Sequence, residues 1–313
     1  MRLVTRPDFD GIVSGALITA VEDIDAYLFV EPKFMQDGAV DIRPGDIIAN
    51  LPYHPACTLW FDHHFTNGAA GFDRPVVPGR GAFRLAPSAA RVVFEYYSEV
   101  PSASEARYRP GFELMHTDRF TALLEDTDKI DGGYLTREDV LQPAGYVLIS
   151  MTIYGKDGAE EHYWRRLIEL IRDRTLQEVL DDPEVQRRCA RVLGLQERLR
   201  RQLLEHAELR GNVIFLDLRD ADDLTDANRF LLYTLFPEGN ISMKVSRDAQ
   251  RAGTTAISVG YNIFNTTSTV NVGDLLSHYG GGGHRVVGSC RVPEADAERS
   301  MDAILRHITE AET

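Results

Sequence analysis

Short apolar runs alternate with helical patterns through the first half of this 313-residue chain. The strand-like runs occupy residues 2–5, 26–30, 46–50 and 58–61. Helical patterns begin near Gly11 and at Pro87, and a proline in the first turn is a common helix start. This alternation predicts an α/β fold with a doubly wound, mostly parallel sheet.

The chain is too long for one hydrophobic core, so we expect two domains. A helical pattern rich in Arg, Glu and Gln runs from about residue 163 to 209, and strand-like runs resume after Gly211. We therefore predict an α/β domain over residues 1–180, a helical connector over 181–210 and a smaller α/β domain over 211–313.

Charge and apolar patterning limit the classes of partner. The net charge of −14 disfavours binding of long nucleic acid, which needs many Lys and Arg contacts to phosphates, but it allows a small phosphorylated substrate. No apolar stretch approaches the length of a membrane span, and the N-terminal residues lack a secretory apolar region, so we expect a cytoplasmic protein with no membrane partner. The three cysteines are far apart and are expected to be reduced thiols.

Two acidic or imidazole-bearing groups follow strand-like runs. Asp8 and Asp10 come after the first run, and Asp62, His63 and His64 come directly after the fourth. In open α/β sheets the carboxyl ends of the strands form the ligand crevice, where such side chains can hold Mn²⁺ or Mg²⁺ and activate water. The alternatives are an N-cap and a turn aspartate for the first group and a surface histidine pair for the second.

Roles can be suggested for residues of these groups, and other polar residues are candidates for the same site. His63 is the natural metal ligand, and His64 could contact a phosphoryl oxygen or move a proton. Asn50 ends the third strand-like run and could offer a neutral carbonyl ligand. One carboxylate among Asp126, Asp128 and Asp131 could be a distant ligand, the alternative being a solvated acidic loop.

A run of four glycines followed by two cationic or polar side chains stands out in the C-terminal third. Glycines let a backbone approach a ligand closely and present N–H groups to phosphate, and arginine can bind phosphate in a fork. A flexible linker is the alternative. The predicted substrate-binding residues are Gly280, Gly281, Gly282, Gly283, His284 and Arg285.

The strings that contain Asp8, Asp62 and Gly280, in this order and spacing, resemble the DHH phosphoesterases that carry a C-terminal DHH-associated domain, and most closely their exopolyphosphatase-related subgroup. The resemblance covers nearly the whole chain. It implies two Mn²⁺ ions in a cleft between the two domains; Mg²⁺ in place of Mn²⁺, and one ion in place of two, are the alternatives. It implies Asp8 as a ligand of the first metal and Asp10, His63 and Asp128 as ligands of the second, with Asp126 competing for the last place and Asp62 supporting the site. With the candidate Asn50, the predicted metal-site residues are Asp8, Asp10, Asn50, Asp62, His63 and Asp128. The predicted catalytic residues are Arg6, Asp62 and His64.

The chain departs from the family pattern at two positions. The first motif of the family normally opens with a histidine ligand, where this chain has Arg6, and the bridging aspartate is replaced by Asn50. Both changes affect the first metal more than the second. We therefore hypothesise one firmly held metal, with the Arg6 guanidinium replacing part of the missing charge and clamping a phosphoryl oxygen.

The sequence thus predicts a metal-dependent phosphohydrolase that acts on a phosphoanhydride or a small nucleotide phosphoester. One alternative is a catalytically weakened protein that binds or senses a phosphorylated ligand. A processive single-strand exonuclease is disfavoured by the negative charge. The sequence leaves the oligomeric state open, and a homodimer is compatible with it.

Overall fold

The computed structural model describes residues 1–64, 67, 76–77, 79–99, 113, 117–153, 160–221, 228–248 and 251–311. Within these residues, contacts divide the chain into two compact units. The first comprises residues 1–134 and 144–190, and the second comprises residues 135–143 and 191–313. The segment 181–210, expected as a connector, consists largely of helix α10 (Pro183–His206) and strand β7 (Ala207–Arg210), and the division between the units falls within α10.

The first unit contains a six-stranded sheet in the order β2-β1-β3-β4-β6-β5. All neighbouring pairs are parallel except β5 with β6, so the predicted mostly parallel α/β architecture is confirmed. The strands are β1 (Arg2–Thr5), β2 (Ala26–Phe29), β3 (Asp46–Ala49), β4 (Leu59–Asp62), β5 (Val76–Val77) and β6 (Gly81–Phe83). The strands β5 and β6 were not predicted.

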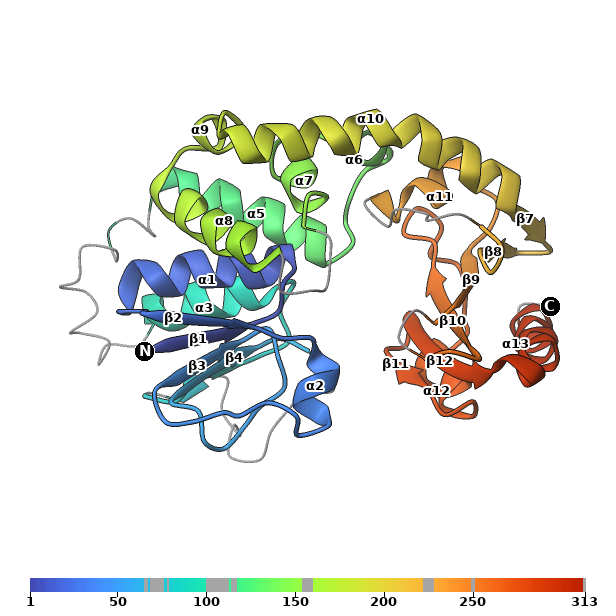
Figure 1. Cartoon of the computed structure of the whole chain (residues 1–313), viewed down its shortest axis with the longest axis horizontal. Coiled ribbons are helices and arrows are strands. Elements are labelled where there is room, and N and C mark those ends of the chain that lie inside the picture. The colour runs from blue at the N-terminus through green and yellow to red at the C-terminus, as the bar shows by residue number, and fades with distance from the viewer. Residues whose placement is uncertain are drawn as a thin grey trace. The chain divides into compact units, whose positions relative to one another are not determined.

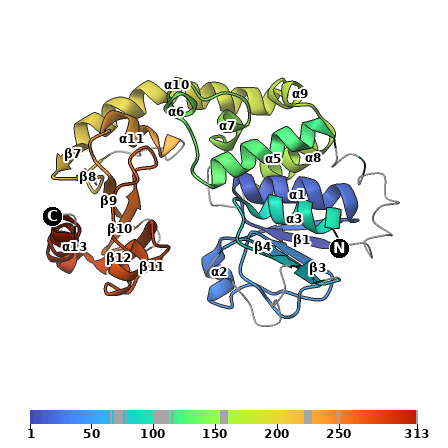
Figure 2. The ribbon, with the colours of Figure 1, turned by 180° about the vertical axis from the view of Figure 1, so that it is seen from behind.

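Helices cover one face of this sheet (Figure 1). Helix α1 contacts α3, α5 and α8, and Figure 2 shows α3 and α5 over the same face. The helices of the unit are α1 (Phe9–Val21), α2 (Pro32–Gln36), α3 (Ala89–Glu99), α5 (Asp118–Asp131), α7 (Gly145–Ser150), α8 (Glu161–Asp173) and α9 (Leu176–Leu180).

Side chains alternate between the two faces of the parallel strands, as a pleated strand requires. Leu3 of β1 and Phe61 of β4 pack toward α1 and α3, where Phe61 meets the ring of Tyr96 edge-on at 5.1 Å between centroids. Their neighbours Val4 and Trp60 belong to a buried cluster on the opposite face. Strands β1, β3 and β4 are therefore buried on both faces, which holds their carboxyl ends rigidly at one edge of the sheet.

The second unit contains a six-stranded sheet in the order β11-β12-β10-β9-β8-β7, in which only β8 and β9 are parallel. Its apolar core includes Met301, Ile304 and Ile308 of the amphipathic C-terminal helix. Its elements besides β7 and part of α10 are α6 (Arg137–Leu141), β8 (Val213–Asp217), α11 (Leu231–Leu235), β9 (Ile241–Arg247), β10 (Thr254–Tyr261), α12 (Val272–Ser277), β11 (Gly282–Gly283), β12 (Val287–Pro293), the 3-10 turn η5 (Glu294–Asp296) and α13 (Ala297–Ala311).

No helix among the described residues is long and apolar enough to cross a membrane.

Candidate metal centre

The carboxyl ends of three neighbouring parallel strands define the candidate site. Thr5, the last residue of β1, pairs with Ala49, the last residue of β3, and Ala49 pairs with Phe61 of β4. The polar segments that follow these strands therefore emerge at one edge of the sheet. The structure brings together at this edge the side chains of Arg6, Asp8, Asp10, Asn50, Asp62, His63 and His64.

Asp8 is surrounded by hydrogen-bond donors. Its Oδ1 accepts hydrogen bonds from the Gly11 N–H and from Nδ2 of Asn50, both at 2.9 Å, and its Oδ2 lies 3.1 Å from Nη1 of Arg6. Asp8 is thus the N-cap of α1, the alternative raised from the sequence, and also an ion-pair partner. Asn50 adopts a left-handed conformation with φ 58°, and its Oδ1 is buried without a partner.

Asp10 is almost completely buried, with 1% of its surface exposed. The first two N–H groups of α3, from Ala89 and Ala90, donate to its two oxygens at 2.8 Å each. These N–H groups have no hydrogen-bond partner within their own helix, so the carboxylate satisfies their hydrogen-bonding capacity. Burial, reinforced by the nearby charge of Asp8, raises the pKa of Asp10 to about 7.

His63 presents an unpartnered nitrogen to two carboxylates. Its Nδ1 lies 2.9 Å from the carbonyl oxygen of Ala86, which can only accept, so Nδ1 carries the proton and Nε2 of the neutral ring has a free lone pair. Nε2 is buried without a hydrogen bond, 3.6 Å from Oδ2 of Asp10 and 3.4 Å from Oδ2 of Asp131. Burial and the charges of Asp10 and Asp8 raise the pKa of Asp131 to about 7.

These three side chains, named here the Asp10–His63–Asp131 cluster, place their ligand atoms within 4.8 Å of one another. A lone pair that faces two carboxylates is electrostatically unfavourable unless a cation or a proton lies between them. One imidazole and two carboxylates are also a normal ligand set for Mn²⁺ or Mg²⁺. The cluster therefore fits a divalent cation.

Asp62 is fully buried and already saturated with donors. Its Oδ1 accepts from the His63 N–H at 2.9 Å and lies 2.8 Å from Nδ1 of His64, while its Oδ2 accepts from Nδ2 of Asn67. Burial disfavours the charged His64 ring, but the hydrogen bond and charge of Asp62 outweigh it, so the pKa of His64 is raised. Asp62 consequently orients the ring of His64 and holds the backbone of His63.

The candidates in the acidic stretch occupy different places on α5. This stretch is a helix, so the solvated-loop alternative is wrong. Asp131, at its last residue, joins the cluster, whereas Asp128 is bound by Arg91 and Ser88. The structure brings Asp131, rather than Asp128 or Asp126, to Asp10 and His63, which the resemblance alone did not indicate.

The glycine run belongs to the second unit, where most of its glycines are required by local packing. A Cβ on Gly281 would lie 2.2 Å from the carbonyl oxygen of Ser289, and Gly280 and Gly283 have positive φ values of 70° and 152°. Gly282 differs, because a Cβ there would meet nothing within 4 Å. A flexible linker is excluded, since Gly282 and Gly283 form strand β11, which pairs with β12, and Gly281 packs closely against Ser289.

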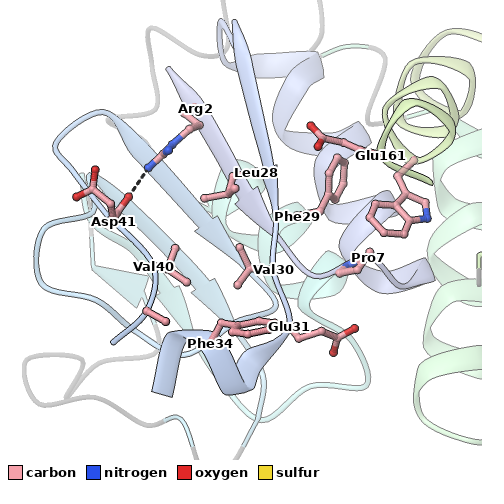
Figure 3. A pocket seen from close by; sticks show the side chains of 12 residues that line it. Arg2, Pro7, Leu28, Phe29, Val30, Glu31, Phe34, Val40, Asp41 and Glu161 are labelled. Carbon is pink, nitrogen blue, oxygen red and sulfur yellow. Dashed lines mark hydrogen bonds between the residues drawn. The ribbon is translucent and has the colours of Figure 1, made fainter. Parts of the chain in front are cut away.

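A separate hollow of about 440 Å³ lies along the edge strand β2 (Figure 3). Its walls include Phe29, Phe34 and Trp164. Two of its lining residues lie next to Arg6. Pro7 follows Arg6 in the chain, and the carboxylate of Glu31 lies 3.8 Å from Nε of Arg6. None of the cluster residues lines it.

Comparisons with known proteins identify the family. No protein-family model matches the chain, and no match was found among curated proteins. Among solved structures, a pGpG-specific phosphodiesterase, PggH from Vibrio cholerae, is 32% identical over 99% of both chains, with a TM-score of 0.78. The chain therefore belongs to the DHH phosphoesterase family, as its sequence predicted.

More distant structures share the fold. RecJ from Thermus thermophilus in complex with Mn²⁺ has a TM-score of 0.58 and 14% identity over 99% of this chain and 52% of RecJ. An exopolyphosphatase-related protein from Bacteroides fragilis has a TM-score of 0.50 and 12% identity over 100% of this chain and 93% of that protein.

Proposed function

We propose that this chain is a divalent-metal-dependent phosphodiesterase that hydrolyses pGpG or a closely related dinucleotide to mononucleotides. The observation that carries the metal-dependent chemistry is the unpartnered Nε2 of His63 between Asp10 and Asp131. The substrate class rests on the 32% identity to the pGpG-specific enzyme over 99% of both chains. The net charge of −14 also favours a small substrate over a long strand.

The Asp10–His63–Asp131 cluster would hold the cation. When bound, a divalent ion would polarise a phosphoryl oxygen and lower the pKa of water. The Ala86 carbonyl fixes the proton of His63 on Nδ1, which keeps Nε2 available as a ligand. The α3 N–H groups hold both oxygens of Asp10 in place.

We propose that one cation is enough for the reaction, because N–H donors already contact both carboxylate oxygens of Asp8. A second cation bound by Asp8 would meet the Arg6 guanidinium and the Asn50 amide N–H group, both of which repel positive charge. Arg6 would instead bind a phosphoryl oxygen and stabilise the charge that develops on it.

His64 would supply a proton. The carboxylate of Asp62 raises the pKa of His64, which favours its protonated form, and holds the ring through Nδ1. The opposite ring nitrogen could then donate to the sugar oxygen that leaves phosphorus. Water adds its hydroxyl to phosphorus and releases its other proton to solvent, the bridging P–O bond breaks, and the leaving sugar oxygen takes the proton from His64, so pGpG yields two molecules of GMP. The segment from Gly280 to Arg285 would bind the rest of the substrate.

The test is a panel of substrates with Mn²⁺: pGpG, another 5′-phosphorylated dinucleotide, a ten-nucleotide RNA and polyphosphate. We expect turnover of pGpG, little of the two longer polymers, and loss of turnover in Asp10→Ala. Preferred hydrolysis of the long RNA or polyphosphate would contradict the proposal. Thermal stabilisation by pGpG without turnover would instead identify a protein that binds a phosphorylated ligand.

A further inference from the structure

Asp128 lies close to the metal centre without joining it. Its Oδ2 accepts hydrogen bonds from Nε and Nη2 of Arg91, at 2.9 and 2.6 Å. Its Oδ1 accepts from Oγ of Ser88 at 2.7 Å. Both carboxylate oxygens are thus used by α3 and by the residue that precedes it. The carboxylate links α5 to the N-terminus of α3.

Ser88 connects Asp128 to the first turn of α3. Its side chain is fully buried, and its Oγ accepts the N–H of Arg91 at 3.1 Å while donating to Asp128. The next two N–H groups, of Ala89 and Ala90, are those that bind the two oxygens of Asp10. A displacement of Ser88 would therefore move the donors that hold Asp10.

The same helix α5 carries a proposed ligand one turn further on. Asp131 follows Asp128 by three residues, a spacing that places both on neighbouring positions of one helix face. Asp131 reaches His63 directly, whereas Asp128 reaches Asp10 through Ser88 and α3. The relative placement of α3 and α5 therefore sets the distance between the two carboxylates of the cluster.

We propose that Asp128, with Ser88 and Arg91, is a positioning residue that fixes the spacing of Asp10 and Asp131 for the cation. This inference rests on the proposed metal-dependent function. It assigns Asp128 a role through α3 instead of direct contact with the metal. Removal of the link should loosen the ligand geometry and weaken cation binding while leaving the ligands themselves present.

The test measures the Mn²⁺ dissociation constant by calorimetry and by the electron paramagnetic resonance signal of free Mn²⁺, without substrate. We expect Asp128→Ala and Arg91→Ala to raise this constant about 10- to 100-fold. Asp128→Asn keeps an acceptor for Ser88 and should weaken binding less. If Asp128 were instead a direct ligand, Arg91→Ala would free its carboxylate and binding would stay the same or tighten, which would overturn the proposal.

A matched control separates this effect from general loss of stability. Arg166 binds one oxygen of Asp182 through Nε and Nη2, as Arg91 binds one oxygen of Asp128, and none of the cluster residues takes part in that pair. Arg166→Ala should leave the Mn²⁺ dissociation constant within about twofold of the wild type, since residues that share no partners act independently. Equal weakening in Arg166→Ala and Arg91→Ala would overturn the positioning role.

The same titration distinguishes failure of the proposed function from failure of the positioning role. Wild-type protein that binds Mn²⁺ but does not hydrolyse pGpG would contradict the proposed function and leave the positioning role standing if Asp128→Ala still weakens binding. If the wild type hydrolyses pGpG and Asp128→Ala binds Mn²⁺ as tightly as the wild type, only the positioning role is overturned. Wild-type protein that binds no Mn²⁺ would overturn both.

Discussion

Nη1 of Arg6 lies 3.1 Å from Oδ2 of Asp8, while the amide of Asn50 donates to the other oxygen of that carboxylate. The charge of Asp8 raises the pKa of Arg6 despite the burial of the guanidinium, so the side chain is positively charged at every accessible pH. A permanent positive charge is thereby fixed beside a cluster of carboxylates. A second cation at Asp8 would have to displace it.

Arg6 is expected to act on the substrate rather than on the proposed cation. Arg6→Ala should lower kcat for pGpG by about 100- to 1,000-fold, because a donor to the transition-state oxygen is lost. Arg6→Lys should recover part of the rate, since it restores the charge but not the planar fork. Steady-state kinetics measure both. Unchanged kcat in Arg6→Ala would remove Arg6 from the reaction.

Replacing the two donors by ligands should create a second metal site. In the double variant Arg6→His with Asn50→Asp, Asp8 would face an imidazole and a carboxylate instead of N–H donors. We expect the wild type to bind one Mn²⁺ per chain and the double variant to bind two, counted by native mass spectrometry. Two ions in the wild type at near-neutral pH would refute the role given to the Arg6–Asp8 pair.

The raised pKa values of Asp10 and Asp131 predict how stability depends on pH without metal. Both carboxyls have pKa values of about 7 in the folded protein, against about 4 when unfolded. Between these values the folded state binds more protons, so the free energy of unfolding should fall as the pH rises from about 5 to about 7. Urea unfolding in EDTA measures this slope.

A variant and an added metal serve as controls for that slope. Asp131→Asn should flatten it, because one of the two coupled carboxyls is removed. Saturating Mn²⁺ should oppose it, since the cation replaces the protons and binds more tightly as the pH rises. A wild-type slope that matches that of Asp131→Asn in EDTA would show that the buried carboxyls do not titrate in this interval.

Two adjacent glycines distinguish packing from substrate binding in the second unit. Gly281→Ala forces a Cβ to within 2.2 Å of the Ser289 carbonyl oxygen and should lower the free energy of unfolding by about 1–3 kcal/mol. Gly282→Ala meets nothing within 4 Å, so it should leave stability unchanged while raising KM for pGpG. Thermal unfolding and kinetics measure the two effects, and an unchanged KM in Gly282→Ala would argue against ligand contact there.

The sequence indicated the parallel sheet because buried strands in such sheets form short apolar runs separated by helical patterns. It also brought Asp10 and His63 to one edge, since both follow parallel strands. It did not indicate strands β5 and β6, whose two and three residues are too short to show a period. Strand β4 extends to Asp62, one residue beyond the predicted run, because Asp62 continues the pairing with β6.

The ligand role proposed for Asp131 depends on tertiary packing that local patterns do not encode. The run with Asp126, Asp128 and Asp131 supplied three carboxylates, and only the way α5 packs in the unit selects one. On spacing alone, Asp128 is as suitable a metal ligand as Asp131. The structure shows that Arg91, 37 residues earlier in the chain, binds Asp128 instead. A helical interpretation of this stretch would have placed Asp128 and Asp131 on one face, which was the available signal.

Hydrolysis of pGpG can be followed during a Mn²⁺ titration while the bound metal is counted in the same samples, which tests the proposed one-cation reaction. We expect the rate to saturate when one Mn²⁺ is bound per chain, and His63→Ala to lose both the bound ion and the activity. A rate that rises only as a second ion binds, or activity that persists in His63→Ala, would contradict that proposal.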